Sequence, residues 1–392
     1  MNPHAELVVD LDAIRENVAT LRTRVAPARM MSVVKADGYG HGLAPVARAA
    51  RAGGAEWLGV AFAEEAMALR DAGDTGRILS WLAVPEEDYT RPIAADVDVT
   101  ASSVEQLAEI GAAARSLGAT ARVQLKVDTG LSRNGCSPAL WPAFVDSAAR
   151  AEGEGSIRVT GVWSHLACAD EPGHPANDAQ EQAFRDALKL VDEHGLSPEV
   201  RHLANSAGAL LRPSARFDLV RCGIATYGLS PAPAITGSAE LGLVPAMTAQ
   251  SRLALVKRIP AGSGVSYGHT WVAGKDTTVA LVPVGYGDGV IRLASSRAHV
   301  LLAGRRRPIV GRVCMDQFVV DLGDDDAAPG DVAVLFGSGA RGEPTAQDWA
   351  EACETISYEI VTRIGGRMRR EYSDDPAARG RLSRGSAPEG EA

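Results

Sequence analysis

The 392-residue sequence lacks several features that would each point to a particular class of protein. No apolar run approaches the roughly 18 residues that a helix needs to cross a bilayer. The first residues, MNPHAELVVDLD, have neither the basic region nor the long apolar region of a signal peptide. Basic residues are not in excess, since 40 Lys and Arg stand against 49 Asp and Glu, giving a net charge of −9. This balance argues against a nucleic-acid-binding surface.

Cysteine is also scarce. The five cysteines are widely spaced and never form a CxxC pair: Cys136, Cys168, Cys222, Cys314 and Cys353. This spacing supports neither a disulfide framework nor a zinc site, so we predict no metal. Reduced thiols and the absent signal peptide together predict a cytoplasmic protein without a membrane segment.

The first 235 residues show alternating strand and helix patterns. An apolar repeat predicts a helix over residues 12–25, with Asp12 as its N-cap. Ala-rich helical segments separate most of the strand candidates that follow. The strand candidates are 31–36, 57–61, 77–81, 96–100, 121–127, 158–163, 199–203 and 217–221, and the later helices are 43–52, 63–72, 103–117, 138–152 and 177–194. Eight strands alternating with helices predict an α/β fold of the (β/α)8 barrel (TIM barrel) type.

From residue 236 the pattern changes to strands and turns with few helices, which predicts a mostly β domain over 236–378. Residues 1–10 are assigned to the barrel or, alternatively, pair with this second domain. We predict a helix near 345–353 and another element over 357–364. The polar, low-complexity residues 379–392 predict a disordered tail. The expected strands are 247–258, 278–284, 299–303, 308–314, 317–321 and 331–336.

Polar and titratable side chains follow the predicted barrel strands at their carboxyl ends, where barrel enzymes place their active sites. Each one alone could be a solvated surface charge, but together they indicate a site. They are Lys35 and Tyr39 after the first strand, Lys126, Asp128 and Arg133 at the fifth, His165 after the sixth, His202, Asn205 and Ser206 at the seventh, and Arg221, Gly223 and Ile224 at the eighth.

This ring of residues suits a phosphorylated aldehyde cofactor. A lysine whose pKa is lowered by burial or by neighbouring cations can form a Schiff base. Backbone N–H groups of Gly223 and Ile224, with the hydroxyl of Ser206, can hold a phosphate. Arg133 and Arg221 supply positive charge. Pyridoxal 5′-phosphate (PLP) fits these requirements.

With these residues in view, the sequence resembles the alanine racemase family over about residues 6 to 372. The resemblance rests on nine ordered motifs rather than on one short match. They are VVKADGYGHG (33–42), KVDTGLSRNG (126–135), WSHLACAD (163–170), HLANSAG (202–208), VRCGIATYGLSP (220–231), VSYGHT (265–270), VGYGDG (284–289), GRVCMDQ (311–317) and ISYEI (356–360). The family has a PLP-binding (β/α)8 barrel followed by a β domain, in agreement with the pattern read from the chain.

The resemblance implies a role for each matching residue. Lys35 is implied to hold PLP covalently and to act as one catalytic base, with Tyr267 as the second. Arg221 is implied to face the pyridine nitrogen and His165 to lie beside the ring, while Arg133 and the backbone N–H of Met315 bind the substrate. The remaining implied roles are phosphate contacts by Tyr39, Ser206, Gly223, Ile224 and Tyr358, a further cofactor contact by Asn205, and supporting contacts by Lys126, His202 and Asp316.

The resemblance further implies that Tyr267 and Met315 reach the site of the other subunit, so that the active protein is a homodimer. The implied reaction is the interconversion of L- and D-alanine, which supplies D-alanine for peptidoglycan. Lys126 stands where many family members carry a carbamylated lysine, and the sequence leaves both its free and its carbamylated state open.

Three alternatives remain at this point. A racemase acting on serine or on several amino acids differs only in pocket size, and one methylene or hydroxyl group discriminates by only about 1–3 kcal/mol. A PLP decarboxylase of the same fold would place a carboxylate where Arg221 stands. A non-enzymatic PLP carrier would lack the β domain, and therefore Tyr267 and Met315.

Overall fold

The computed structural model describes residues 3–373 and divides the chain into two compact units. The first contains Arg15–Gly38 and Gly42–Leu243 and is an α/β barrel. The second contains Met1–Ile14, Tyr39–His41 and Val244–Ala392 and is mostly β. The predicted tail, 379–392, lies outside the described residues. Among residues 3–373, no helix combines the length and apolarity required to span a membrane.

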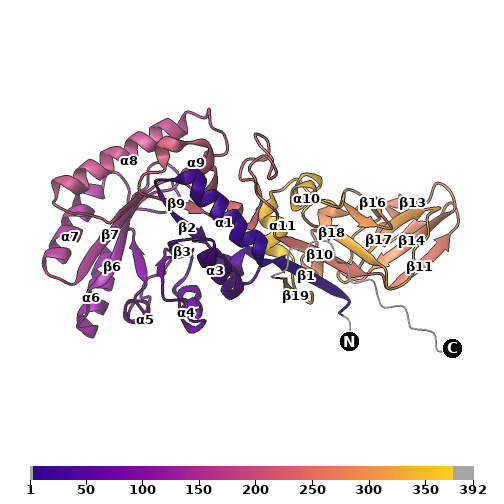
Figure 1. The fold of residues 1–392 in the computed structure, drawn as a ribbon, viewed down its shortest axis with the longest axis horizontal. Coiled ribbons are helices and arrows are strands. Elements are labelled where there is room, and N and C mark those ends of the chain that lie inside the picture. Colours follow the sequence, from indigo (N-terminus) through magenta and orange to yellow (C-terminus); the bar gives the residue numbers. More distant parts are fainter. Residues whose placement is uncertain (1–2, 374–392) are drawn as a thin grey trace. The chain divides into compact units, whose positions relative to one another are not determined.

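The barrel unit is an eight-stranded parallel sheet in the order β8-β7-β6-β5-β4-β3-β2-β9 (Figure 1). Backbone hydrogen bonds from Asp218 N to Arg201 O and from Arg221 N to Ala204 O, each 3.0 Å, link its first and last strands and nearly close the barrel. The predicted (β/α)8 architecture is confirmed. The strands are β2 (Arg29–Val33), β3 (Trp57–Val60), β4 (Arg77–Ser80), β5 (Asp98–Ala101), β6 (Ala121–Lys126), β7 (Ile157–Trp163), β8 (Val200–His202) and β9 (Leu219–Cys222).

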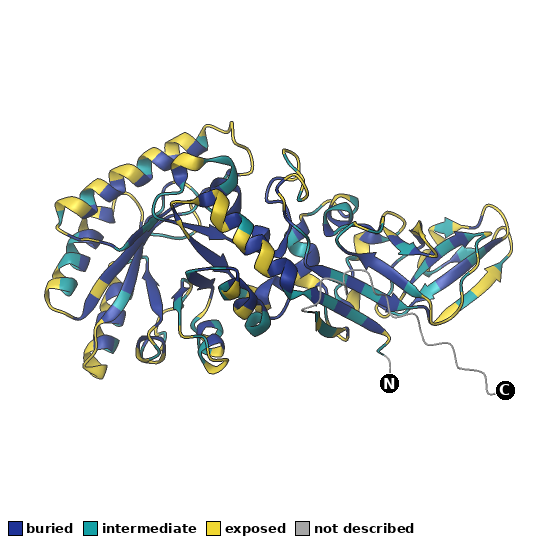
Figure 2. Cartoon of the chain, viewed as in Figure 1, coloured by how far each residue is buried: buried dark blue, intermediate teal, exposed yellow. Residues whose placement is uncertain are grey.

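Helices cover the outside of this sheet, with their polar faces exposed and the strands buried (Figure 2). The sequence did not predict the two shortest, α5 and α9, because five or six residues are too few to show a helical repeat. The helices are α1 (Leu11–Val25), α3 (Leu43–Ala52), α4 (Ala63–Asp71), α5 (Thr90–Ala94), α6 (Val104–Leu117), α7 (Trp141–Gly153), α8 (Ala176–Glu193) and α9 (Ser206–Leu211), with 3-10 turns at Pro213–Ala215 and Ile224–Tyr227; the element labelled α2 (Lys35–Tyr39) is a left-handed turn.

The N-cap predicted for the first helix was wrong. Helix α1 begins at Leu11, and the carboxylate of Asp10 accepts a hydrogen bond from Ala13 N at 2.8 Å. Asp10, the last residue of the preceding strand, therefore caps a backbone N–H of the first turn, the role that the sequence had suggested for Asp12.

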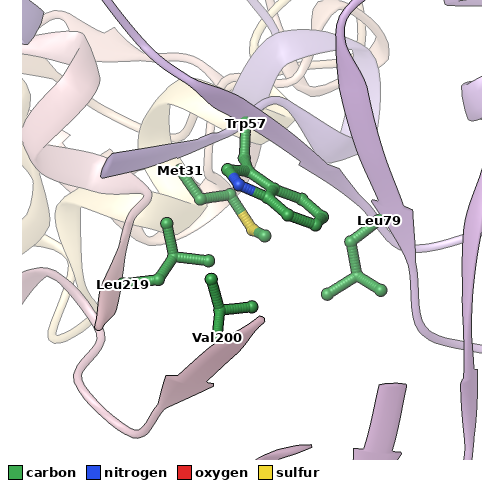
Figure 3. Packing of buried hydrophobic residues seen from close by; sticks show 5 residues of the cluster. All are labelled: Met31, Trp57, Leu79, Val200 and Leu219. Carbon is green, nitrogen blue, oxygen red and sulfur yellow. The ribbon is translucent and has the colours of Figure 1, made fainter. Parts of the chain in front are cut away.

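An apolar cluster occupies part of the barrel interior. It consists of Met31, Trp57, Leu79, Val200 and Leu219, each at most 2% exposed (Figure 3). These residues come from five strands that are distant in the sequence, so the cluster ties the strands to one another. Burying side chains of this size stabilises the fold by about 1.5–3 kcal/mol each.

The second unit contains a nine-stranded sheet in the order β11-β14-β17-β16-β15-β18-β10-β1-β19. The N-terminal strand β1 pairs antiparallel with β10 and parallel with β19. The strands are β1 (Ala5–Asp10), β10 (Met247–Arg252), β11 (Leu255–Ile259), β14 (Thr277–Val282), β15 (His299–Leu302), β16 (Arg305–Val310), β17 (Phe318–Gly323), β18 (Val332–Phe336) and β19 (Arg369–Ser373), with β12 (Gly264–Val265) paired to β13 (Trp271–Val272), helices α10 (Ala346–Ala352) and α11 (Ser357–Arg363), and 3-10 turns at Tyr267–His269, Tyr286–Asp288 and Arg292–Ala294.

Two strands of this unit differ from their predictions. The run 247–258 is two strands, β10 and β11, which occupy distant places in the sheet. The strand predicted over 308–314 begins earlier, at Arg305, and ends at Val310, because Gly311 has a φ of +72°.

Candidate active site

Lys35 begins a left-handed turn, with one residue between it and the end of strand β2. Ala36, Asp37 and Tyr39 have φ of 54°, 53° and 51°, a region that costs non-glycine residues about 1–2 kcal/mol each. The barrel holds this turn in place, since Ala36 N donates to Glu65 Oε1 at 2.6 Å and Leu43 N to the Asp37 carboxylate at 2.8 Å. Strain of this kind, maintained by specific hydrogen bonds, is typical of functional sites.

The electrostatic surroundings of Lys35 favour its neutral amine. Burial lowers the lysine pKa, the positive charge of Arg133 lowers it further, and Glu65 partly opposes both. The Nζ atom lies 5.7 Å from the Trp81 ring centroid. The unprotonated amine is the nucleophilic form of lysine, and a lowered pKa increases its share.

Arg221, on strand β9, is buried with neutral partners. NH1 donates to His202 Nδ1 at 2.8 Å and to His202 O at 3.2 Å. NH2 donates to Ser164 O at 2.7 Å, Leu203 O at 3.0 Å and His165 Nδ1 at 3.1 Å. Burial lowers the Arg221 pKa to about 9, which leaves the guanidinium charged at neutral pH. A charge held by carbonyls and imidazoles remains available to an anionic ligand.

Both histidines that contact Arg221 are neutral. Burial lowers the pKa of His165 and of His202 well below the ordinary value, and the charge of Arg221 adds to the effect in each case. Because an arginine can only donate hydrogen bonds, each Nδ1 must be an acceptor. The proton of each neutral ring therefore lies on Nε2.

Lys126, at the end of strand β6, is a second buried amine. Burial lowers its pKa to about 7, with further lowering by Arg221 and Arg133. The neighbouring loop leads to Arg133 and is folded around the Asp128 carboxylate, which accepts hydrogen bonds from Gly130 N at 2.9 Å and Ser132 N at 3.1 Å. The barrel unit thus gathers four basic side chains: Lys35, Lys126, Arg133 and Arg221.

Four of the residues expected to bind the cofactor lie on two loops of the barrel: Asn205, Ser206, Gly223 and Ile224. The Asn205 side chain accepts from Gly208 N at 2.9 Å and caps helix α9. Ser206 Oγ accepts from Gly223 N at 2.8 Å, so these two expected ligands are already bonded to each other. The Ser206 hydroxyl proton can still donate to a ligand, and Gly223 leads directly into the turn that begins at Ile224.

Tyr39 and Tyr358 lie together in the second unit, with ring centroids 6.2 Å apart. Burial raises the pKa of Tyr39, and Tyr358 raises it further, so its hydroxyl stays protonated and can donate a hydrogen bond. Gly40 follows with a φ of +79°, and a Cβ there would lie 2.2 Å from Val361 O. Only glycine fits this approach between the turn and helix α11.

The second unit presents Tyr267 and Met315 at its surface, 72% and 55% exposed. Ser266, with a φ of 62°, donates from Oγ to Arg312 O at 2.6 Å and fixes the turn before Tyr267. Gly287 N donates to Met315 O at 2.8 Å, which ties the Met315 loop to the 284–289 motif. Large exposed side chains on rigid turns are suited to completing an interface.

Sequence reasoning missed several buried or ion-paired residues in each unit. Gln124, Asp98 and Trp163 are buried in the barrel, and Arg367 binds both Asp288 and Asp316 in the second unit. A signal for Gln124 does exist, since it lies two residues before Lys126 on a strand and therefore on the same face. Asp98, in the pattern DVDVT, instead looks like the exposed side of an alternating strand.

The chain matches two family models, described as "Alanine racemase, N-terminal domain" over residues 9–231 and "Alanine racemase, C-terminal domain" over residues 246–372. It is 58% identical over 373 residues to an alanine racemase of Thermobifida fusca, covering 95% of this chain and 99% of the relative. Together, the two models span both units of the structure.

Solved structures give the same result. The crystal structure of alanine racemase from Streptomyces lavendulae superposes with a TM-score of 0.95 at 54% identity, covering 97% of this chain and all of the other. The alanine racemase of Bartonella henselae, 27% identical with a TM-score of 0.84, was solved with covalently bound pyridoxal phosphate; the match covers 95% of this chain and all of that one. The resemblance found in the sequence is confirmed, and the chain belongs to the alanine racemase family of isomerases.

Proposed function

We propose that this protein interconverts L- and D-alanine with PLP as its cofactor. Family membership supports the reaction class. The observation that carries the proposal for this chain is the Lys35 amine, whose pKa is lowered by burial and by Arg133, on a strained turn at the carboxyl end of the barrel. An amine with a lowered pKa among basic side chains suits an anionic aldehyde.

The residues present fit PLP. Lys35 would hold the cofactor covalently, Arg221 would donate a hydrogen bond to its ring nitrogen, and Arg133 would contact its phenolic oxygen. Bound PLP would withdraw electrons from the substrate Cα and make its proton acidic. The proposed contacts to the phosphate and the ring face are Tyr39, Asn205, Ser206, Gly223, Ile224, Tyr358 and His165.

Racemisation needs a proton-transfer group on each face of Cα. We propose Lys35 for one face and Tyr267 of the partner subunit for the other. The 72% exposure of Tyr267 in the single chain is consistent with such a role. The backbone N–H of Met315, held beside Asp316, would bind the substrate carboxylate from the same partner. The active protein is therefore proposed to be a homodimer.

Arg133 would bind the substrate carboxylate from the barrel side, with Lys126 orienting it. Since the pKa of Lys126 is near 7, a large fraction of its amine is neutral at physiological pH and can add carbon dioxide. The resulting carbamate would be an anion placed to pair with Arg133. Lys126 is thus proposed to be carbamylated.

Arg221 favours racemisation over other reactions of the same cofactor. Even with its pKa lowered to about 9 by burial, the Arg221 guanidinium keeps its proton at neutral pH. The pyridine nitrogen would therefore accept a hydrogen bond without being protonated, which limits electron withdrawal. A decarboxylase would need a carboxylate here, and the partners of Arg221 are His202, His165 and backbone carbonyls.

The alternative substrate is serine, or a broader set of amino acids, because a single hydroxyl group changes binding only modestly in such a pocket. A non-enzymatic PLP carrier is disfavoured by the second unit with its exposed Tyr267 and Met315. We also propose that the D-alanine serves peptidoglycan synthesis in the cytoplasm, where the five free cysteines would stay reduced.

Chiral chromatography of L-alanine and L-serine, incubated separately with PLP-loaded protein, tests the proposal. We expect an equal mixture of alanine enantiomers, formed much faster than D-serine. Lys35→Ala should abolish the conversion, while Lys257→Ala, at an exposed lysine on strand β11, should leave it intact. If serine turned over faster than alanine, serine would replace alanine as the proposed substrate. If neither amino acid turned over, the result would favour a non-enzymatic PLP carrier protein.

A further inference from the structure

A row of buried polar side chains crosses the barrel interior from Arg221. His202 Nε2 lies 2.8 Å from Gln124 Oε1, and Gln124 Nε2 lies 3.3 Å from Asp98 Oδ2. Gln124, His202 and Asp98 are fully buried, and Arg221 is 4% exposed. Asp98 is the first residue of strand β5, whereas Arg221 is near the end of β9, so the row joins the two ends of the barrel.

All hydrogen bonds in this row run in the same direction, with the donor on the Arg221 side and the acceptor on the Asp98 side. Arg221 can only donate, so Nδ1 of His202 accepts and its Nε2 carries the proton. Nε2–H then donates to the carbonyl oxygen of Gln124, whose amide N–H donates to Asp98. A flipped Gln124 amide would place N–H against N–H, so this geometry fixes both the tautomer and the amide orientation.

Asp98, at the far end of the row, is held by two charged donors and one hydroxyl. Asp98 also accepts from Arg77 NH2 at 2.9 Å, from Arg122 Nε at 2.6 Å and from Thr160 Oγ1 at 2.7 Å. At Gly161 a Cβ would lie 2.8 Å from Gln124 Cδ, so glycine leaves room for the glutamine side chain. A directional row of hydrogen bonds is polarised along its length and strengthens each member.

We infer that Gln124 and Asp98 are positioning residues that hold His202 as the Nε2–H tautomer and thereby aim the Arg221 guanidinium. Among the residues described, no hydrogen-bond partner is found for Arg221 Nε, so this donor is available to a ligand. His202 is also stacked on Trp163, with ring centroids 5.6 Å apart and planes 3° apart, which limits its tilt. Only the identity of the ligand that Arg221 would face, the PLP ring nitrogen, rests on the proposed function.

The test compares Gln124→Met with Thr160→Val in the PLP-loaded protein. Both variants remove one hydrogen bond to Asp98, but only the first interrupts the row. The readouts are the 15N NMR signals of the histidine rings, with His202 assigned through His202→Asn, and the steady-state kinetics of alanine racemisation. The NMR measurement needs no turnover, so it tests the row even if the protein racemises another amino acid.

In Gln124→Met we expect the His202 Nε2–H signal to shift or to exchange with water, and kcat to fall about tenfold with KM within about twofold of wild type. Thr160→Val should leave both readouts unchanged. Wild-type His202 protonated on Nδ1, or unchanged ring signals or kcat in Gln124→Met, would overturn the inference. If Gln124→Met does not fold, Gln124→Asn is used instead. Its side chain is one methylene shorter, so the amide stays polar but cannot bridge His202 and Asp98, and the same outcomes apply.

Discussion

The Lys126 Nζ atom lies 4.2 Å from the centroid of the Trp163 ring. The ring face stabilises the charged amine, but burial and the charges of Arg221 and Arg133 act in the opposite direction and lower the Lys126 pKa to about 7. Burial is the dominant effect. The barrel therefore contains a lysine that titrates near neutral pH.

Lys126 should react with carbon dioxide. Addition of the neutral amine to carbon dioxide forms an N–C bond and releases one proton, giving a carbamate. In protein equilibrated with 13C-labelled bicarbonate we expect one carbamate 13C signal, which is absent in Lys126→Arg. The exposed Lys257 provides the control, since Lys257→Arg should keep the signal. A spectrum without a carbamate signal would show that Lys126 remains a free amine.

The same lysine should make stability depend on pH in cofactor-free protein kept free of carbon dioxide. Between its folded pKa of about 7 and its ordinary value of about 10.4, the unfolded state binds the proton and the folded state does not. The free energy of unfolding should therefore rise with pH in this window, by at most about 1.4 kcal/mol per pH unit from this group. Urea denaturation at several pH values measures the slope.

Lys126→Met serves as the reference for that experiment, because it retains the packing against Trp163 and cannot titrate. The difference between the wild-type and variant slopes isolates the contribution of Lys126. Equal slopes in the two proteins would mean that Lys126 titrates at its ordinary pKa in the folded state.

The barrel could be predicted closely because its strands are short apolar runs buried on both faces. Strand β3, for example, begins at Trp57 as predicted, and helix α3 spans Leu43–Ala52 as predicted. The side chains at the carboxyl ends were equally visible, since strand order alone places Lys35, His202 and Arg221 at one end of the barrel.

The features of the site that could not be predicted from the sequence depend on contacts between distant segments. Asp98 looks like a surface residue until Arg77 and Arg122 are brought beside it by neighbouring strands. The Ser206–Gly223 hydrogen bond likewise joins two loops whose approach no local pattern encodes. The left-handed turn after Lys35 carries only Gly38 and Gly40 as signals, although Ala36, Asp37 and Tyr39 adopt the same region.

Arg367 should support the Met315 loop. It donates to both carboxylate oxygens of the buried Asp288 at 2.8 Å and to Asp316 at 2.7 Å. Burial would raise the pKa of Asp288, but the hydrogen bonds from Arg367 and Gly285 N hold it below its ordinary value. Arg367→Gln should therefore lower Tm at pH 7 and raise the KM for alanine, because the loop beside Asp316 loosens.

The pH dependence of that loss follows from the lowered pKa. Stability from a carboxylate with a depressed pKa is present above its ordinary value of about 3.9 and is lost as pH falls below it. The Tm difference between wild type and Arg367→Gln should thus shrink at acidic pH. Arg363→Gln, which removes an exposed pair with Glu359 on helix α11, is the control and should change Tm little. An equal loss in both variants would contradict a special role for Arg367.

Tyr267→Phe should separate the two faces of proton transfer. Because the two alanine enantiomers have equal energy, kcat/KM must fall equally in the two directions, so it cannot identify the base on each face. Exchange in D2O can, since Lys35 would still remove and return the Cα proton on its own face. We expect one enantiomer to gain deuterium while keeping its configuration and the other to exchange at least about a hundredfold more slowly, within the range ascribed to a positioned acid–base group.

Mass spectrometry after chiral separation measures the deuterium content of both enantiomers. Tyr286→Phe, at another partly exposed tyrosine of the second unit, is the control and should exchange both enantiomers. Fast exchange of both in Tyr267→Phe would assign the second proton transfer to another group.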